Sequence, residues 1–341
     1  MPQVVEQMHR ELESQRGFLT DKTIRTIYFG GGTPSLLSPS EIERFISHAG
    51  EIFDTSSVEE ITIEVNPDDI TESYVAELRK SYVNRVSMGV QSFDDNCLRF
   101  MGRRHSAEQA VTAIKRLREG GIENISVDII FGVSGFGDKS LENTLQQVIA
   151  ADVEHISAYH LTIEPQTRFG RLLAKGEMEQ IPEPQSEAEF LLVHNTLTEA
   201  GFEHYEVSNY ARPGYRSRHN SSYWTGVEYL GIGPGAHSYT DGRRRWCEQS
   251  VEQYIAGVEY GEEYLTQTDT LNEYVMVSLR RAEGIDLQII AQRWSEAEVE
   301  RISAAAEQFI ATGRMVREQN TIRIVPQHFL VSDAVITELF A

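Results

Sequence analysis

The sequence predicts an α/β fold in which parallel strands alternate with helices, followed by a small helical domain that ends in a hairpin. Short apolar runs alternate with segments of helical periodicity over the first part of the chain, which is the pattern of βαβ units. The runs contain apolar residues suited to both faces, as expected of strands buried in a parallel sheet. From about residue 268 the pattern changes to consecutive helices followed by a hairpin.

The first part of the chain opens with an amphipathic helix over 2–16, where apolar residues recur on one face. Ser38-Pro39-Ser40-Glu41 is a capping box with proline at the first helical position, so the next helix starts near 39. The strands are predicted at 24–29, 60–65, 85–90, 124–131 and 155–161. The remaining helices of this part are predicted at about 71–80, 106–119 and 139–151.

The second part is less regular. The stretch 164–185 is rich in proline, glycine and charge and is predicted to be a long loop, and a helix follows at about 186–200. The stretch 203–211 resembles another strand, whereas 212–248 shows no clean period. Three helices and a hairpin, typical of a winged-helix-like domain, are predicted at 270–281, 286–294, 296–312 and 315–325, with the hairpin turning at Gln319-Asn320.

Composition excludes several classes of protein. The 341 residues carry a formal net charge of −21, which repels nucleic-acid phosphates. No apolar run approaches the roughly 18–20 residues that a membrane span needs. The first residues are charged and do not resemble a signal peptide, so a cytoplasmic location is expected. The two cysteines, Cys97 and Cys247, cannot supply the three or four thiolates of an iron–sulfur cluster.

Polar residues follow several of the predicted strands. The turn Gly30-Gly31-Gly32-Thr33-Pro34 follows the first strand, Glu64 closes the second, Gln91 closes the third and Asp128 lies in the fourth. Taken singly, the glycines could form a plain tight turn, and a strand carboxylate could be a paired core residue. Ligands bind at the carboxyl ends of parallel strands, so the combination favours a polar ligand site.

Two further segments carry candidate binding residues. Arg103 follows the third strand and could bind a ligand carboxylate, or could be a solvated surface residue. The segment 218–224 combines His219 with aromatic side chains, and the glycine-rich segment 231–238 follows it. Together they could line a flat apolar pocket, and histidine is a common axial ligand of haem iron. For any single histidine, a hydrogen-bonding role is the alternative.

Six segments together resemble one family, at 27–38, 63–69, 85–105, 125–132, 155–165 and 218–239. The family is the coproporphyrinogen III oxidase-like branch of the radical S-adenosylmethionine (SAM) proteins, and the resemblance covers essentially the whole chain. The HNxxYW motif at 219–224 resembles the haem chaperones of that branch and not its true oxidases. The resemblance implies an incomplete (β/α)₆ barrel at 1–200, an extension carrying HNxxYW at 201–265 and a winged-helix-like domain at 266–341.

The resemblance also implies residue roles. Contacts to the methionine part of SAM would come from Gly31, Gly32 and Thr33. The hydroxyls and amino group of SAM would be held by Glu64, Gln91 and Asp128, and its carboxylate by Arg103. His219 would occupy the haem-binding position. The family also binds a [4Fe–4S] cluster through a CxxxCxxC loop after its first strand.

That CxxxCxxC loop is absent from the sequence, where Met1 falls within what would be the first helix. The chain is therefore expected to lack the first barrel strand and the cluster, to bind SAM weakly and to be inert in radical chemistry. An unpaired sheet edge is expected to lower its stability. A mis-assigned start codon is the favoured explanation, and a cluster-free relative is the other.

The resemblance predicts a binding and delivery protein that binds haem and transfers it to an acceptor protein. One alternative is an oxygen-independent coproporphyrinogen III oxidase, an enzyme, against which the HNxxYW motif argues. The other is a regulator that uses the winged-helix-like tail on DNA, against which the net charge argues.

Overall fold

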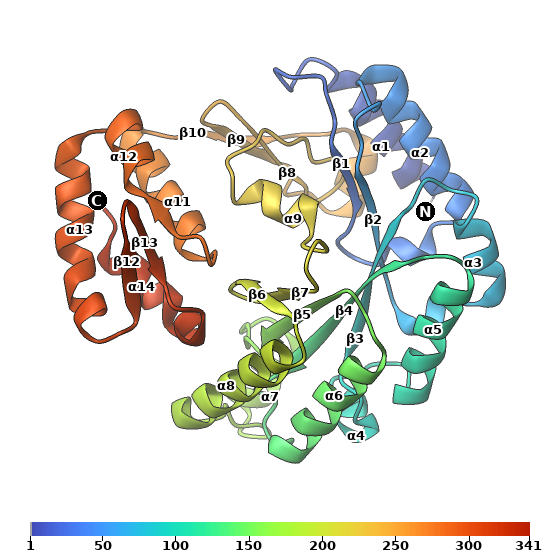
Figure 1. The fold of residues 1–341 in the computed structure, drawn as a ribbon. Coiled ribbons are helices and arrows are strands. Elements are labelled where there is room, and N and C mark those ends of the chain that lie inside the picture. The colour runs from blue at the N-terminus through green and yellow to red at the C-terminus, as the bar shows by residue number, and fades with distance from the viewer. Residues whose placement is uncertain (1) are drawn as a thin grey trace.

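The computed structural model describes residues 2–341, and its centre is a curved seven-stranded sheet in the order β1-β2-β3-β4-β5-β7-β6 (Figure 1). The first five strands run parallel, as the sequence predicts, whereas β7 is antiparallel to both of its neighbours. The strands are β1 (Thr26–Phe29), β2 (Glu60–Val65), β3 (Arg85–Gln91), β4 (Asn124–Phe131), β5 (His155–His160), β6 (Glu203–Glu206) and β7 (Asn209–Ala211). We call this sheet with its helices the half-barrel.

Helices lie on the outer, convex face of the sheet (Figure 1). The predicted capping box is confirmed, because the Ser38 side chain accepts from the Glu41 amide and Glu41 reaches back to the Ser38 amide. The helices are α1 (Pro2–Ser14), α2 (Pro39–Ile52), α3 (Glu72–Leu78), α4 (Asp95–Phe100), α5 (Ala107–Glu119), α6 (Asp138–Ala150), α7 (Arg168–Ala174) and α8 (Glu183–Glu199). Among residues 2–341, no helix is both long enough and apolar enough to cross a membrane.

The expectation that the strands are apolar on both faces is wrong. Side chains alternate, so that Ile61, Ile63 and Val65 of β2 belong to the hydrophobic core. Glu60 and Glu64 alternate with these residues and lie on the concave face, where they bond to α9 and to the glycine turn. The other polar residues of this face include Ser87, Ser126, Asp128, His155 and Ser157, and they contact one another across strands.

Three segments fold differently from the sequence prediction. The single strand predicted at 203–211 is the hairpin β6–β7, which reverses around Val207 and Ser208. The predicted loop at 164–185 contains α7, whose N-terminus is capped by Thr167. The unpatterned stretch contains α9 (Arg218–Tyr223), β8 (His237–Thr240) and β9 (Arg243–Trp246), and after α10 (Val251–Ala256) the strand β10 (Gly261–Tyr264) completes a second sheet.

The C-terminal part lies on the left of Figure 1, and α9 with the second sheet stands between it and the half-barrel. Its elements follow the helix–strand–helix–helix–hairpin order of a winged helix, with Gln319 in the predicted turn at a positive φ of 53°. They are α11 (Gln267–Leu279), β11 (Ile285–Asp286), α12 (Leu287–Arg293), α13 (Glu296–Ala311), β12 (Met315–Glu318), β13 (Thr321–Ile324) and α14 (Ser332–Glu338). The domain boundaries near 200 and 265 stay a prediction.

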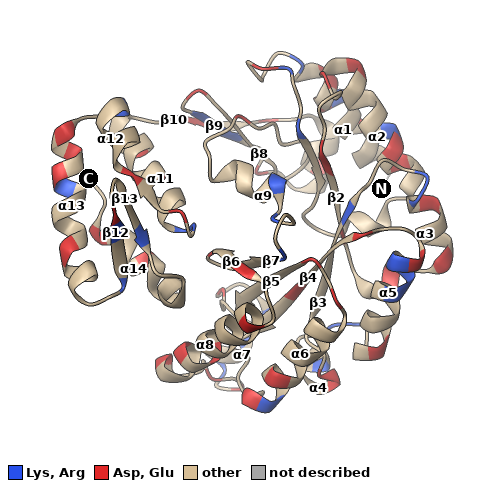
Figure 2. Ribbon diagram, viewed as in Figure 1, with Lys and Arg blue, Asp and Glu red and all other residues tan. Residues whose placement is uncertain are grey.

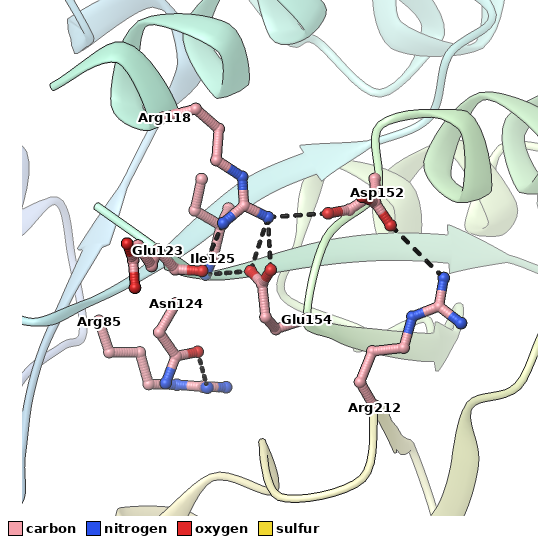
Figure 3. A network of polar contacts seen from close by, with 8 residues as sticks. All are labelled: Arg85, Arg118, Glu123, Asn124, Ile125, Asp152, Glu154 and Arg212. Atoms are coloured by element: carbon pink, nitrogen blue, oxygen red, sulfur yellow. Dashed lines mark hydrogen bonds and ion pairs between the residues drawn. The ribbon is translucent and has the colours of Figure 1, made fainter. Parts of the chain in front are cut away.

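An ion-pair network joins the amino ends of β4 and β5 (Figure 3). The Arg118 guanidinium donates to both carboxylate oxygens of Glu154 at 2.6 and 2.7 Å. One of those oxygens also accepts from the amide of Ile125 at 3.0 Å. The network lies at the amino ends of the strands, opposite the glycine turn. Residues at that end of a parallel sheet usually stabilise the fold, whereas ligands bind at the carboxyl ends.

Candidate functional site

The triple-glycine turn after β1 is open on its outer side. Gly31 and Gly32 have φ values of 72° and 49°, which glycine adopts without the strain that other residues meet. A Cβ atom at either position would meet nothing within 4 Å. Thr33 follows as the residue before a short 3₁₀ helix, and its side chain caps no amide of that helix. The turn therefore leaves room for a ligand to approach the backbone closely.

Glu64 holds this turn against the sheet. One carboxylate oxygen accepts from the Gly31 amide at 3.0 Å, and the other accepts from the Tyr28 hydroxyl at 2.7 Å. Burial, with the Glu64 charge adding to it, raises the pKa of Tyr28 far above its usual range, so that Tyr28 remains a donor. Tyr28 was not among the residues predicted from the sequence. Residues i and i+2 of a strand share a face, so Tyr28 lies on the same concave face as Thr26. This alternation is the sequence signal that could have identified it.

Asp128 lies on the same concave face, two strands away from Glu64. Its neighbours across the sheet are Gly89 and Ser157, and the Ser87 hydroxyl lies 3.4 Å from its carboxylate. Burial raises the pKa of Asp128 to about 6, and the negative charge of Glu64 adds to the rise. The two carboxyl groups thus share one polar face of the sheet, which is suited to a cationic group.

Gln91 and Arg103 converge over Gly89. A bulge interrupts the β3–β4 ladder between Gly89 and Gln91, and Gln91 has a positive φ of 71°. A Cβ atom on Gly89 would lie 2.9 Å from the side-chain nitrogen Nε2 of Gln91 and 3.0 Å from the Arg103 guanidinium. Arg103 donates to the Gly89 carbonyl at 2.8 Å and to the Asn66 side chain at 3.1 Å. Gly31, Glu64, Gln91, Asp128 and Arg103 therefore gather at the carboxyl end of the sheet.

His219 lies apart from that group, on α9 above the inner face of β1. Two of its neighbours hold the ring, because Nδ1 lies 2.8 Å from the Thr26 hydroxyl and Nε2 lies 2.9 Å from the Tyr223 hydroxyl. The ring also stacks on Tyr28 with centroids 4.7 Å apart. Burial lowers the pKa of His219 to about 4, so the imidazole is neutral at pH 7.

A buried glutamate fixes the position of α9. Glu60 of β2 accepts from the backbone amides of Arg218 and His219 at 2.9 and 3.0 Å, and the Ser217 hydroxyl lies 3.4 Å from it. Only 3% of Glu60 is exposed. A carboxylate so placed satisfies amides that a helix leaves unpaired at its N-terminus. The sequence analysis did not find this role, because Glu60 and α9 are far apart along the chain.

The residues present do not fit a [4Fe–4S] cluster. Cys97 is buried in α4, and Cys247 is buried after β9 in the second sheet. Burial raises the pKa of both thiols, which disfavours the thiolate that a cluster needs. Within residues 2–341, no three His, Cys, Asp or Glu side chains are grouped so as to hold a metal ion.

Comparisons with known proteins agree on one family. Residues 5–148 match the model of the radical SAM superfamily. The haem chaperone HemW of Bacillus subtilis is 34% identical over 80% of this chain and 74% of its own length. HemW of Mycobacterium tuberculosis is 32% identical over 97% of this chain and 85% of its own.

A solved structure confirms the fold class predicted from the sequence. Coproporphyrinogen III oxidase (HemN) of Escherichia coli, a radical SAM enzyme, superimposes with a TM-score of 0.82 over 100% of this chain and 83% of its own. At 20% sequence identity, this likeness bears on the fold alone. The family itself is shown by the HemW relatives and the matching model: the chain belongs to the HemW family of radical SAM proteins.

Proposed function

We propose that this protein is a haem chaperone, which binds haem and transfers it to an acceptor protein. The observation that carries the proposal is His219, a neutral imidazole held by aromatic neighbours on a helix that a buried glutamate fixes in place. A neutral imidazole nitrogen is a ligand of haem iron. The named activity of the HemW relatives supports the proposal. We also propose that the protein is cytoplasmic. Its two cysteines are unpaired, as is usual in the reducing cytosol.

The geometry defines how His219 would meet the iron. If Nδ1 donates its proton to Thr26, Nε2 carries the lone pair, and Nε2 is the nitrogen that faces the Tyr223 hydroxyl. The contact to Thr26 would orient the ring in the way that outer hydrogen bonds orient metal-ligating histidines. Iron would replace the Tyr223 hydroxyl at Nε2, so the tyrosine side chain would turn away when haem binds.

A haem titration of the full chain tests this function. Wild-type protein is expected to develop a Soret band on addition of haem, and His219→Ala to weaken binding. His237→Ala is the matched control, because His237 is exposed at the start of β8. Equal binding by wild type and His219→Ala would contradict the ligand assignment. No Soret band in wild-type protein would contradict the function itself.

The strand-end residues are proposed to bind SAM. The open glycine turn would face the methionine part, the carboxylates of Glu64 and Asp128 would attract the amino group, and Arg103 would attract the carboxylate. All of these contacts would be made by residues of this chain. The printed names of the HemW relatives favour a binding role over an oxidase activity.

DNA binding through the winged-helix-like domain is disfavoured by charge. By its position in the order of elements, α13 corresponds to the recognition helix of a winged helix. It carries four glutamates and one arginine. Figure 2 shows acidic residues along this helix. Phosphates are repelled by such a surface. A gel shift at physiological salt is expected to show free DNA, and clear retention would contradict this reasoning.

A further inference from the structure

A cavity of about 640 Å³ lies between the HNxxYW segment and the C-terminal domain. One wall contains Tyr223 and Trp224, the last two residues of the motif, and continues to Tyr229 and Tyr239 by the second sheet. The opposite wall comes from α11, β11 and α12 of the C-terminal domain. The cavity is therefore formed by parts of the chain that are distant in sequence, and the strand-end group of Glu64 and Asp128 does not line it.

The walls are suited to a flat, largely apolar molecule. The two tyrosines Tyr223 and Tyr229 meet edge to face at 4.8 Å, and Tyr229 stacks beside Tyr239 at 6.2 Å. Across the cavity, Met276, Val277 and Ile289 supply aliphatic surface. Aromatic and aliphatic walls with a few polar groups are characteristic of small-molecule sites of this volume.

The charge of the lining differs from that of the whole chain. Three arginines face three carboxylates in the cavity, although the chain has a formal net charge of −21. Arg244 and Arg281 are engaged by glutamates, as the pairs with Glu273 and Glu283 show. Arg293, whose guanidinium lies 4.6 Å from the Trp294 ring, forms no ion pair within residues 2–341. It is thus available for a carboxylate of the ligand.

A single side chain, that of Tyr223, connects the cavity with His219. The Tyr223 ring lines the cavity, and its hydroxyl lies 2.9 Å from His219 Nε2. A ligand that displaces Tyr223 therefore gains access to the nitrogen that would bind iron.

We propose that this cavity is the haem site, in which the porphyrin lies between the HNxxYW segment and the C-terminal domain, Arg293 holds a propionate and Tyr223 separates the empty cavity from His219. The inference rests on the proposed function and adds to it that the C-terminal domain forms half of the site. The porphyrin ring, and not only its iron, would then be recognised.

Two variants of the C-terminal wall test the inference. Ile289→Glu places a carboxylate on an aliphatic wall, and its control is Val111→Glu on α5, since both side chains are partly exposed at 36% and 44%. Arg293→Glu reverses the free arginine, and its control is Lys115→Glu on α5, a lysine whose side chain is 74% exposed. The probes are haem, followed by its Soret band, and iron-free protoporphyrin IX, followed by its fluorescence.

Each wall variant is expected to weaken binding of both probes by about tenfold, as the loss of a buried apolar or charged contact does. The controls are expected to bind like wild type. His219→Ala is expected to weaken haem binding and to leave protoporphyrin IX binding unchanged, because that probe has no iron. If both wall variants bind both probes like wild type while His219→Ala still weakens haem binding, the cavity assignment is overturned and the proposed function stands. If wild-type protein binds no haem, the proposed function itself fails.

Discussion

The buried carboxylate of Glu60 provides a sharp test of how α9 is held. Glu60→Gln keeps the size of the side chain and replaces one acceptor oxygen by an NH₂ group. In the present structure, both oxygens accept from backbone amides, those of Arg218 and His219. The new NH₂ group would face one of these N–H donors, so the substitution removes a hydrogen bond and opposes two donors in a site that is only 3% exposed.

The magnitude follows from the bonds that are lost. A hydrogen bond to a charged group contributes about 1.5–3 kcal/mol, and a buried unsatisfied donor adds to the cost. Glu60→Gln is therefore expected to lower the free energy of unfolding by about 2–4 kcal/mol. Since α9 carries His219, the variant is also expected to bind haem more weakly.

Urea unfolding and haem titration, both on the full chain, measure the two effects. The matched control is Glu59→Gln, one residue earlier, because the Glu59 side chain is 43% exposed and pairs with Arg218 and Arg25 at the surface. Such surface pairs contribute about 0–1 kcal/mol. If Glu60→Gln and Glu59→Gln behaved alike in both assays, the reasoning about α9 would be refuted.

Three further predictions concern the half-barrel. SAM binding, measured by calorimetry, should strengthen about tenfold between pH 5 and pH 7, because Asp128 with a pKa of about 6 becomes an anion over that range, and Asp128→Asn should abolish the dependence. The raised pKa also means that ionising Asp128 lowers folding stability as the pH rises from about 4 through 6, so the stability of wild type relative to Asp128→Asn should fall over that range, and a rise in this difference would contradict the assignment. Glu154→Gln should lower the free energy of unfolding by about 1–3 kcal/mol through loss of the two-pronged pair with Arg118, whereas Asp152→Asn, 89% exposed and paired at 3.7 Å, should change it by less than about 1 kcal/mol. Equal effects of the two substitutions on urea unfolding would contradict the importance of the network in Figure 3.

Local signals were sufficient for much of the half-barrel. The capping box at Ser38 and the apolar runs are properties of a few neighbouring residues, so the parallel strands β1–β5 and helix α2 could be predicted. The strand-end group followed from topology, because carboxyl ends of parallel strands share an edge. The polar concave face was missed because an alternation of polar and apolar residues was interpreted as a fully buried strand.

Non-local contacts account for the rest. Nothing near residue 60 in the sequence indicates that Glu60 caps a helix starting at Arg218, and nothing in the HNxxYW motif indicates that Tyr223 occupies Nε2 of His219. Likewise, the cavity combines residues from Tyr223 to Thr321, and its existence depends on how the C-terminal domain sits against α9. Short hydrogen-bonded strands such as β8 and β9 lack a clear period and were not predicted either.

The central claim is that His219 binds the iron of a haem held by this chain. The most direct measurement is the hyperfine coupling between ferric haem and ¹⁵N-labelled histidine in this chain loaded with haem. A coupling to one histidine nitrogen is expected in wild type and in His237→Ala, and its loss is expected in His219→Ala. Persistence of that coupling in His219→Ala, with haem still bound, would contradict the claim.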